Sequence, residues 1–386
     1  MSHTSAEVRI GVLGCGQLAL LAHLRTVRGL PGARLVAFAE PDDERRRAAR
    51  LQAPEARALA DYRDLLALDG VDAVIISLPP ALHAEAAAAA HASGRHVYLE
   101  KPLATDAEGG RKALEAWRTS GREGMIGFNY RFNRLFREAK RLLDTRNLGP
   151  PVAVRTVFAS AIRPQPGWMG DRRMGGGVLL DLASHHVDLI RWLFGEISEV
   201  GCSMPQGGVA GDTAALELVL RDGLPVQSFF SHRAVDEDRF EIYCEGGSMK
   251  LDRRHGLVVE LSSGVDSAHR RDQLRNVWRA ARNASYVMEK RRAFGGEPSW
   301  YHALTHFVEA ARGDHPASPD FDDGFRSLEI VLAAEDSARD GRRTRVDRPD
   351  RAMGSDATGP SERVANEENP RMSVIMVTPD RFDRLR

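Results

Sequence analysis

Two short motifs carry residue types that could move a hydride and a proton. Lys101 stands in an E-K-P tripeptide after a short apolar run, and Asp181 and His185 stand one helical turn apart after a glycine triplet. A lysine can hydrogen-bond a substrate hydroxyl and stabilise developing alkoxide charge. Histidine is the side chain whose ordinary pKa best suits proton transfer near neutrality. We therefore predict Lys101, Asp181 and His185 as catalytic residues, with the aspartate orienting the imidazole or contacting the substrate itself.

Each motif alone has a structural explanation. A lysine in E-K-P is often a surface residue of a loop, and a D-x-x-x-H pair is more often a helix cap and a packed histidine. His186 and Asp188 stand close to the predicted pair, and we assign them no chemistry. The i, i+4 spacing favours a shared role for Asp181 and His185, because such residues lie on one face of a helix.

A glycine-rich loop near the N-terminus predicts a dinucleotide site. Residues 11–19 read G-V-L-G-C-G-Q-L-A, which places G-x-G-x-x-A between a predicted strand and a predicted helix. The first glycine permits a tight turn, the second lets a pyrophosphate approach the backbone, and the small third residue lets the helix pack on the strand. The phosphates then lie over the helix N-terminus, where free N–H groups favour negative charge. The predicted cofactor contacts here are Gly14, Gly16, Gln17 and Leu18.

Glu40, at the end of the second predicted strand, indicates which dinucleotide binds. A carboxylate at this position accepts hydrogen bonds from the adenosine ribose and repels a 2′-phosphate, which favours NAD over NADP. Arg45 and Arg46 follow closely and could bind a phosphate instead, so NADP stays an alternative.

Several residues are weaker candidates for the site. His83 starts a predicted helix after two prolines and could line the cofactor cleft, although a polar helix-start residue explains it as well. Asn129 and Arg131 follow a predicted strand and could meet the nicotinamide or the substrate. Trp168 offers an aromatic face that could stack on a sugar ring, although it could equally be an interface or core residue. The other histidines considered, His232, His302, His306 and His315, show no grouping typical of a metal site, so we predict no metal.

Composition excludes several classes of protein. Lys+Arg and Asp+Glu both number 54 in 386 residues, and this balance argues against a nucleic-acid-binding protein. No apolar run approaches the roughly 18 residues that span a bilayer, and the polar start of the chain lacks a signal-peptide core. The 3 cysteines are far apart and odd in number, as expected for reduced thiols in the cytoplasm. We expect a cytoplasmic protein that binds a small molecule rather than nucleic acid or membrane.

The pattern of predicted strands and helices changes once along the chain. Strands and helices alternate through residues 1–130, which predicts a parallel, doubly wound dinucleotide-binding sheet with Lys101 at its ligand-binding carboxyl edge. Strand-like alternation then predicts an α+β domain on an antiparallel sheet over 131–348, with helices returning at 272–290, 300–312 and 324–339. The Gly-, Ser- and Glu-rich composition of 349–386 predicts a disordered tail.

Together these segments resemble one family. The matching pieces are 11–19, S-L-P-P-A-L-H at 77–83, G-R-H-V-Y-L-E-K-P-L at 94–103, G-F-N-Y-R-F at 127–132, and G-G-G-V-L-L-D-L-A-S-H-H-V-D at 175–188. They resemble the glucose–fructose oxidoreductase, inositol dehydrogenase and rhizopine-catabolism (Gfo/Idh/MocA) family over roughly residues 7–346. The resemblance implies a Rossmann domain followed by a domain on an open, mostly antiparallel sheet that commonly forms homodimer or homotetramer contacts. It also implies further cofactor contacts, from Ser77, Pro79, His83, Glu100 and Lys101.

The resemblance implies a reaction as well. Lys101 would take the role of the family's E-K-P lysine, with Asp181 and His185 as its acid–histidine pair, in an NAD(P)-dependent oxidoreductase. The substrate would be a secondary alcohol of a sugar, cyclitol or sugar derivative. Two alternatives stay open: an NAD-dependent glycoside hydrolase on the same fold, and a non-catalytic sensor of sugar or nucleotide. The chain departs from the family at Pro80, where many relatives have asparagine, and in a longer arginine-rich segment, 270–292, expected to be a substrate lid or an oligomer arm.

Overall fold

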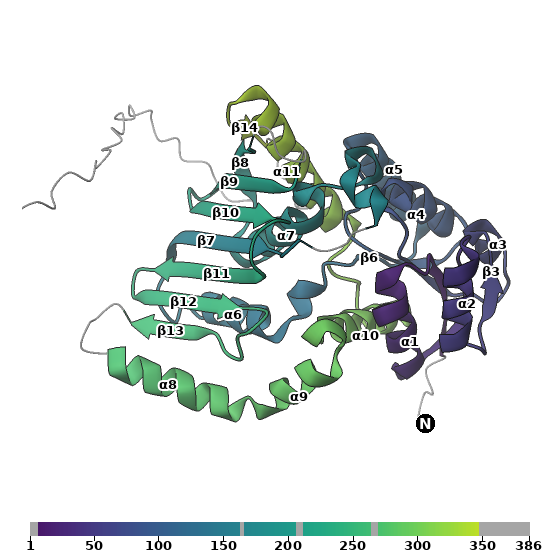
Figure 1. Cartoon of the computed structure of the whole chain (residues 1–386), viewed down its shortest axis with the longest axis horizontal. Helices are drawn as coiled ribbons and strands as arrows, with labels where there is room; N and C mark the ends of the chain where they lie inside the picture. Colours follow the sequence, from purple (N-terminus) through teal and green to yellow (C-terminus); the bar gives the residue numbers. More distant parts are fainter. Residues whose placement is uncertain (1–6, 163–165, 206–210, 264–268, 347–386) are drawn as a thin grey trace, which may run out of the picture. The chain divides into compact units, whose positions relative to one another are not determined.

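The chain builds two sheets, one parallel and one mostly antiparallel, which are joined by helices (Figure 1). The computed structural model describes residues 7–162, 166–205, 211–263 and 269–346; the predicted disordered tail at 349–386 lies outside them. Among the described helices, none has both the length and the apolar character needed to cross a bilayer. The two sheets confirm the predicted α/β class with a doubly wound first domain, while the predicted boundary at residue 130 stays a prediction.

The parallel sheet carries the glycine-rich loop and the E-K-P tripeptide. Its six strands run in the order β3-β2-β1-β4-β5-β6, and their bounds are β1 Val8–Leu13, β2 Ala33–Ala39, β3 Arg57–Leu59, β4 Ala73–Ile76, β5 His96–Leu99 and β6 Gly124–Ile126. The order reverses between β1 and β4, which is the switch point where such sheets bind ligands. The glycine-rich loop after β1 and Lys101 after β5 both lie at the carboxyl edge of this sheet.

Both faces of the parallel sheet are covered. Val74 and Ile76 of β4 pack in one core and Ile75 packs in the other, because successive side chains of a strand point to opposite faces. The first core includes side chains of α4 and α5, and the second includes side chains of α1 and α10. This explains why the apolar run at β4 is continuous rather than alternating. The helices around the sheet are α1 Leu24–Gly29, α2 Asp43–Gln52, α3 Tyr62–Leu66, α4 His83–Ala92, α5 Ala107–Ser120 and α10 Ser299–Ala311.

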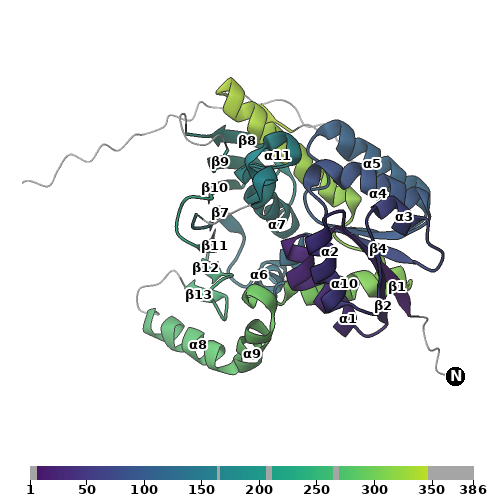
Figure 2. The same cartoon turned by 45° about the vertical axis from the view of Figure 1, so that its right-hand side comes forward.

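The second sheet has eight strands in the order β13-β12-β11-β7-β10-β9-β8-β14. All its pairs are antiparallel except β7 with β10. Helices α6, α7 and α11 lie on one face, and Figure 2 shows the other face without a helix of the described chain. The bounds are β7 Pro151–Ala159, β8 Ile197–Ser203, β9 Thr213–Leu220, β10 Pro225–Ser231, β11 Glu237–Cys244, β12 Gly247–Asp252, β13 Glu260–Ser263, β14 Thr344–Arg345, α6 Arg134–Asp144, α7 Ser184–Phe194 and α11 Phe321–Asp340.

Helix α11 joins the two sheets. A Cβ at Gly110 of α5 would lie 2.8 Å from the Phe325 ring and 2.9 Å from the Leu328 side chain of α11, so a glycine lets these helices pack closely. Near its other end, Ser337 Oγ accepts a hydrogen bond of 3.0 Å from the backbone N–H of Cys202 on β8. One helix therefore contacts α5 over the first sheet and β8 in the second.

The glycine triplet brings the second domain against the first. Gly175 has a φ of +97°, and a Cβ there would lie 2.3 Å from Cβ of Pro80. A Cβ at Gly176 would lie 2.1 Å from the carbonyl oxygen of Met169. Only glycine tolerates both the backbone conformation and the close approach at Gly175. The triplet therefore packs on Pro80, the position at which many relatives have asparagine instead.

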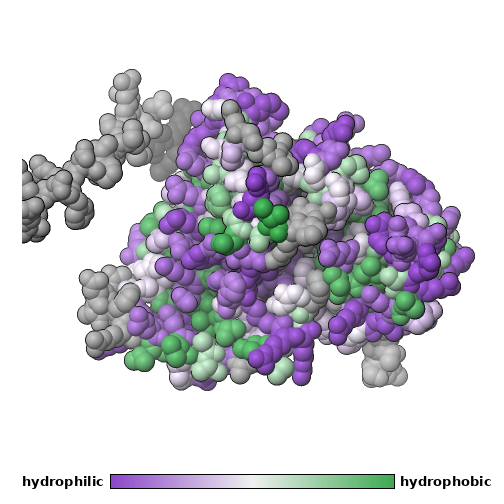
Figure 3. Space-filling view, in the orientation of Figure 1, coloured by the Kyte–Doolittle hydropathy of each residue, from purple (hydrophilic) through white to green (hydrophobic). Residues whose placement is uncertain are grey.

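Helices α8 (His269–Arg282) and α9 (Ala284–Arg292) form an arm beside β13. A single helix predicted over 272–290 was wrong, because the helix is interrupted at Asn283. Leu274, Val277 and Trp278 of α8 are 71%, 67% and 59% exposed, and Figure 3 shows apolar surface at the lower left, where α8 lies. The function of this arm, as lid or oligomer contact, stays a prediction.

Candidate active site

The glycine-rich loop leaves room for a diphosphate. Gly14 has a φ of +88°, and a Cβ there would lie 2.5 Å from the carbonyl oxygen of Ser77, just beyond β4. A glycine is therefore required at this turn. A Cβ at Gly16 would meet nothing within 4 Å, so the backbone there faces open space, as the approach of a pyrophosphate needs. The loop thus fits the dinucleotide that its sequence predicts.

The other loop residues surround this opening. Gln17 is exposed and Leu18 half-buried, directly before a π-helical turn, η1 (Ala19–His23). Pro79 precedes a short 3-10 helix, η2 (Pro80–Leu82), in the loop after Ser77. A direct contact of Gln17, Leu18 or Pro79 with the cofactor stays a prediction.

Glu40 is buried at the end of β2 and is anchored to the glycine-rich loop. Its Oε2 accepts a hydrogen bond of 2.7 Å from the Cys15 backbone N–H. Its Oε1 accepts one of 3.0 Å from the Asp42 N–H and one of 2.9 Å from the Arg45 guanidinium. Arg46 instead donates to the carbonyl oxygens of Glu40 and Pro41. The carboxylate predicted to meet the ribose is therefore fixed beside the loop, and Arg45 offsets part of its charge.

Two other predicted cofactor residues hold the E-K-P loop in place. His83 is buried, with Nδ1 2.6 Å from the Pro102 carbonyl oxygen and Nε2 2.8 Å from that of Leu78. Glu100 is also buried, and its Oε1 lies 2.8 Å from Nε2 of His23 on η1. Both side chains fix the backbone on either side of Lys101, and their contact with a cofactor stays a prediction.

Lys101 and Asp181 meet between the two sheets. Lys101 follows β5, and Asp181 lies on a second π-helical turn, η6 (Leu179–Ala183), directly before α7. The Lys101 Nζ donates to Asp181 Oδ1 at 2.7 Å and to the Asp181 carbonyl oxygen at 2.8 Å. Burial alone would raise the pKa of Asp181, but the Lys101 ammonium holds that pKa below its ordinary value. Two of the predicted catalytic residues are thus in direct contact.

His232 lies at the site, although no role could be assigned to it from the sequence. Its Nε2 lies 3.5 Å from Asp181 Oδ2, the carboxylate oxygen not bound by Lys101. Burial lowers the pKa of His232 even though the nearby carboxylate opposes this shift. No sequence signal could have found it, because His232 follows β10 and becomes a neighbour of Asp181 only through the strand order.

His185 is held by ring stacking. The Tyr130 ring lies 4.3 Å away between centroids, with the two planes inclined by 18°. The imidazole is 8% exposed, and its Nδ1 is buried without a hydrogen-bond partner in the part of the chain that the structure describes. Burial, together with the charges of Lys101 and Arg253, lowers the pKa of His185 well below its ordinary value. The ring is therefore neutral near pH 7 and can accept a proton, while the Asp181 carboxylate faces Lys101 instead of orienting it.

Arg253 supports the stacked rings and was also missed by sequence reasoning. Its guanidinium carbon lies 4.0 Å from the centroid of the Tyr130 ring, and a desolvated cation–π contact of this kind contributes about 2 kcal/mol. Arg253 Nε donates to Asp238 at 2.6 Å and its Nη1 donates to Glu297 at 2.6 Å. His186 Nε2 lies 3.1 Å from the same Asp238, which gives this histidine a structural role.

The weaker substrate candidates lie in different surroundings. Arg131 is buried and donates to Asp188 at 2.8 and 2.6 Å. Asn129 is also buried, and its amide donates to Ser299 Oγ at 2.8 Å. Trp168 is half-buried in the short helix η4 (Gly167–Gly170), which packs on the glycine triplet. The first two serve packing in this structure, and substrate contact by any of the three stays a prediction.

Two family models match the two halves of this arrangement. A model described as an oxidoreductase family with an NAD-binding Rossmann fold matches residues 8–128, and the GFO/IDH/MocA C-terminal domain matches residues 136–250. Inositol 2-dehydrogenase 2 of Saccharopolyspora erythraea is 32% identical over 254 residues, which are 63% of this chain and 73% of the relative. The chain belongs to the Gfo/Idh/MocA oxidoreductase family.

Other known proteins match the chain over more of its length. Myo-inositol 2-dehydrogenase of Thermotoga maritima is 25% identical over 350 residues, which are 88% of this chain and 99% of that protein. A solved structure of the WlbA dehydrogenase from Bordetella pertussis, in complex with NADH and UDP-GlcNAcA, is 25% identical with a TM-score of 0.75 and covers 90% of this chain and 100% of that one. The predicted family and the predicted NAD cofactor are confirmed, and the chain is an NAD-dependent oxidoreductase.

Glu40→Gln should shift cofactor preference toward NADP. The amide keeps an acceptor for the Cys15 N–H but removes the charge that repels a 2′-phosphate, and it frees Arg45 to bind that phosphate. We expect the ratio of NADPH to NADH dissociation constants, measured by fluorescence titration, to fall by about tenfold, which corresponds to about 1.4 kcal/mol. Arg47→Ala, at an exposed arginine of α2 that donates to the Asp43 carbonyl oxygen, is the matched control and should leave the ratio unchanged. An unchanged ratio in Glu40→Gln would show that this carboxylate does not select the cofactor.

Proposed function

We propose that this oxidoreductase transfers a hydride between a secondary alcohol carbon of a sugar, cyclitol or sugar derivative and the nicotinamide of NAD, with Lys101, Asp181 and His185 as catalytic residues. The observation that carries the proposal is the ion pair of Lys101 and Asp181, with a neutral His185 one turn further along. The inositol dehydrogenases among its relatives and the sugar-nucleotide complex of the WlbA dehydrogenase support a polyol substrate. NAD supplies the hydride-accepting carbon when it is bound, so the side chains must bind the hydroxyl and take its proton.

Lys101 is the group that would bind the substrate oxygen. An ammonium has three donors, and two of them go to the carboxylate and the carbonyl oxygen of Asp181. The third donor is left to hydrogen-bond the substrate hydroxyl and to stabilise the alkoxide charge that develops on it. Asp181, held on its other oxygen by His232, would fix the direction of that donor.

His185 would act as the general base in oxidation. Its pKa lies well below the ordinary value, so at neutral pH the imidazole holds a lone pair for the hydroxyl proton. The imidazole would take the hydroxyl proton as the substrate carbon gives up its hydride, for which bound NAD would supply the acceptor. The same ring would return the proton in the reductive direction. Tyr130 and Arg253 would be positioning residues, because they hold the ring in place.

The proposed reaction is tested by its stoichiometry. The purified full chain is incubated with NAD⁺ or NADP⁺ and a panel of inositols, free sugars and nucleotide-linked sugars, while reduced cofactor and released sugar are both measured. We expect one substrate class to give reduced NAD in equal amount to oxidised product. Sugar release without net NADH would instead identify a glycoside hydrolase on this fold. Tight NAD binding with no turnover across the panel would identify a sensor.

His185→Ala should lower kcat by about 10²–10⁴-fold, the usual contribution of a positioned general base. NADH binding, measured by fluorescence titration, should stay intact. His91→Ala is the matched control, because it removes an equally buried imidazole from α4, and its kcat should stay close to that of the parent. Parent-like turnover in His185→Ala would remove this residue from the mechanism.

We further propose a cytoplasmic homodimer or homotetramer that forms through the helix-free face of the second sheet. Phe229 is 39% exposed on that face, where Arg155, Arg239, Glu217 and Glu241 also line a shallow groove. Apolar area flanked by charges of both signs suits a self-complementary contact. The thiols of all three cysteines are free, which supports a reducing compartment.

Phe229→Arg should weaken this assembly. The substitution places a new cation beside Arg155 and Arg239 of the same face, in the centre of the proposed contact. We expect a fall in molar mass by light scattering coupled to size-exclusion chromatography. Leu51→Arg, at an apolar side chain that is 86% exposed on α2, should leave the mass unchanged. An unchanged mass in Phe229→Arg would contradict assembly through this face.

A further inference from the structure

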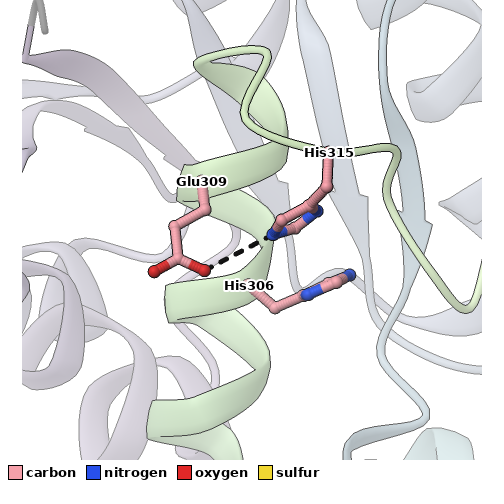
Figure 4. Close-up of side chains that lie close together, drawn as sticks. All are labelled: His306, Glu309 and His315. Atoms are coloured by element: carbon pink, nitrogen blue, oxygen red, sulfur yellow. Dashed lines mark hydrogen bonds and ion pairs between the residues drawn. The ribbon is translucent and has the colours of Figure 1, made fainter.

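Helix α10 and the loop that follows it bring two histidines and a glutamate together. His306 and Glu309 lie on α10 and His315 lies beyond its end, and one ligand atom from each lies within 4.8 Å of the other two. Figure 4 shows the Glu309 carboxylate and the His315 ring pointing toward each other, with the His306 ring beside them. The sequence predicted no metal here, because helical periodicity could not place His315 against the helix it follows.

The hydrogen bonds of His315 aim a lone pair at Glu309. Its Nδ1 lies 3.0 Å from the carbonyl oxygen of Pro316, and since a carbonyl only accepts, Nδ1 carries the proton. Its Nε2 then faces Glu309 Oε2 at 3.4 Å. Two acceptors in this position need a cation between them, which is either a proton on Nε2 or a metal ion. Histidines that bind metals usually donate their other ring N–H to a carbonyl or carboxylate, as His315 does.

His306 offers a third donor. Its ring stacks on His315 with the centroids 4.1 Å apart, and its Nε2 accepts a hydrogen bond of 3.2 Å from the Ser318 backbone N–H. The side chain is half-buried, and a neutral imidazole offers one nitrogen lone pair to a metal ion.

We propose that His306, Glu309 and His315 bind one Zn²⁺ or a similar divalent transition-metal ion, with water as the fourth ligand. Bonds of about 2.0–2.2 Å in a tetrahedron set the ligand atoms roughly 3.3–3.6 Å apart, and the Glu309–His315 pair has this spacing at 3.4 Å. His306 reaches the ion by turning its ring away from Ser318. The side chains of His315 and Glu309 are 33% and 45% exposed, so they have room to adjust. Imidazole nitrogens favour zinc-like ions over Mg²⁺ or Ca²⁺.

The bound ion stabilises the loop that connects α10 to α11 at the edge of the parallel sheet. Just after His315, Ala317 N–H donates to the Glu123 carboxylate at 2.8 Å, and the Pro319 carbonyl accepts from Ile126 N–H of β6 at 2.9 Å. A metal-bound His315 holds this segment against α10 from the other end. Its role is therefore structural.

The test is a metal titration of the full chain after chelator treatment and dialysis. Zn²⁺ is added in competition with a chromogenic chelator, and Co²⁺ is added separately because its visible absorption reports the ligand geometry. We expect one Zn²⁺ per chain with micromolar or tighter affinity, and a higher melting temperature in its presence. His315→Ala and Glu309→Gln should each weaken Zn²⁺ binding by at least about 10–100-fold, the loss seen even for changes outside the ligand shell.

His302→Ala is the matched control, because it removes an exposed imidazole one turn earlier on α10 and should bind Zn²⁺ like the parent. His315 is the preferred target because His306 also packs on Phe132, with ring centroids 5.2 Å apart, and its loss could disturb folding. Either of two results overturns the proposal: no saturable Zn²⁺ binding at micromolar concentration, or parent-like binding in both His315→Ala and Glu309→Gln. The pair would then be an ordinary histidine–glutamate ion pair.

Discussion

The ion pair between Lys101 and Asp181 is the contact on which the site depends. It joins a residue at the end of β5 to a residue on the turn before α7 over 2.7 Å, and the two side chains are only 15% and 24% exposed. Loss of one partner from a buried pair costs about 3–5 kcal/mol, and partial exposure reduces that figure here, so the pair stabilises the contact between β5 and the turn before α7. The left-handed Gly175 and its close approach to Pro80 act in the same direction, because they let the turn that carries Asp181 come near the first sheet.

Residues whose roles follow from their immediate neighbours in the chain could be predicted. Gly14 had to be glycine because a tight turn follows a buried strand, and its positive φ agrees. Lys101 could be placed at the carboxyl edge because a strand precedes it. The two kinds of sheet could be predicted in the same way. The continuous apolar run at 73–76 indicates a strand buried on both faces, whereas the alternation in β9 and β10 indicates strands with one covered face.

Contacts between distant segments could not be predicted in this way. His232 becomes a neighbour of Asp181 only because β10 ends beside η6, and Arg253 reaches Tyr130 from a turn after β12. The i, i+4 spacing suggested that Asp181 orients His185. The structure places Asp181 inside a π-helical turn, whose wider spiral changes how such residues face one another, and Lys101 takes its carboxylate.

The arm of α8 and α9 shares its support with the proposed catalytic imidazole. Lys290 of α9 donates to the carbonyl oxygen of Arg253 at 2.9 Å. The side chain of Arg253 lies over Tyr130, and Tyr130 stacks on His185. The arm and the proposed general base therefore share one support: α9 anchors the backbone of Arg253, and the Arg253 guanidinium covers the ring that stacks on His185.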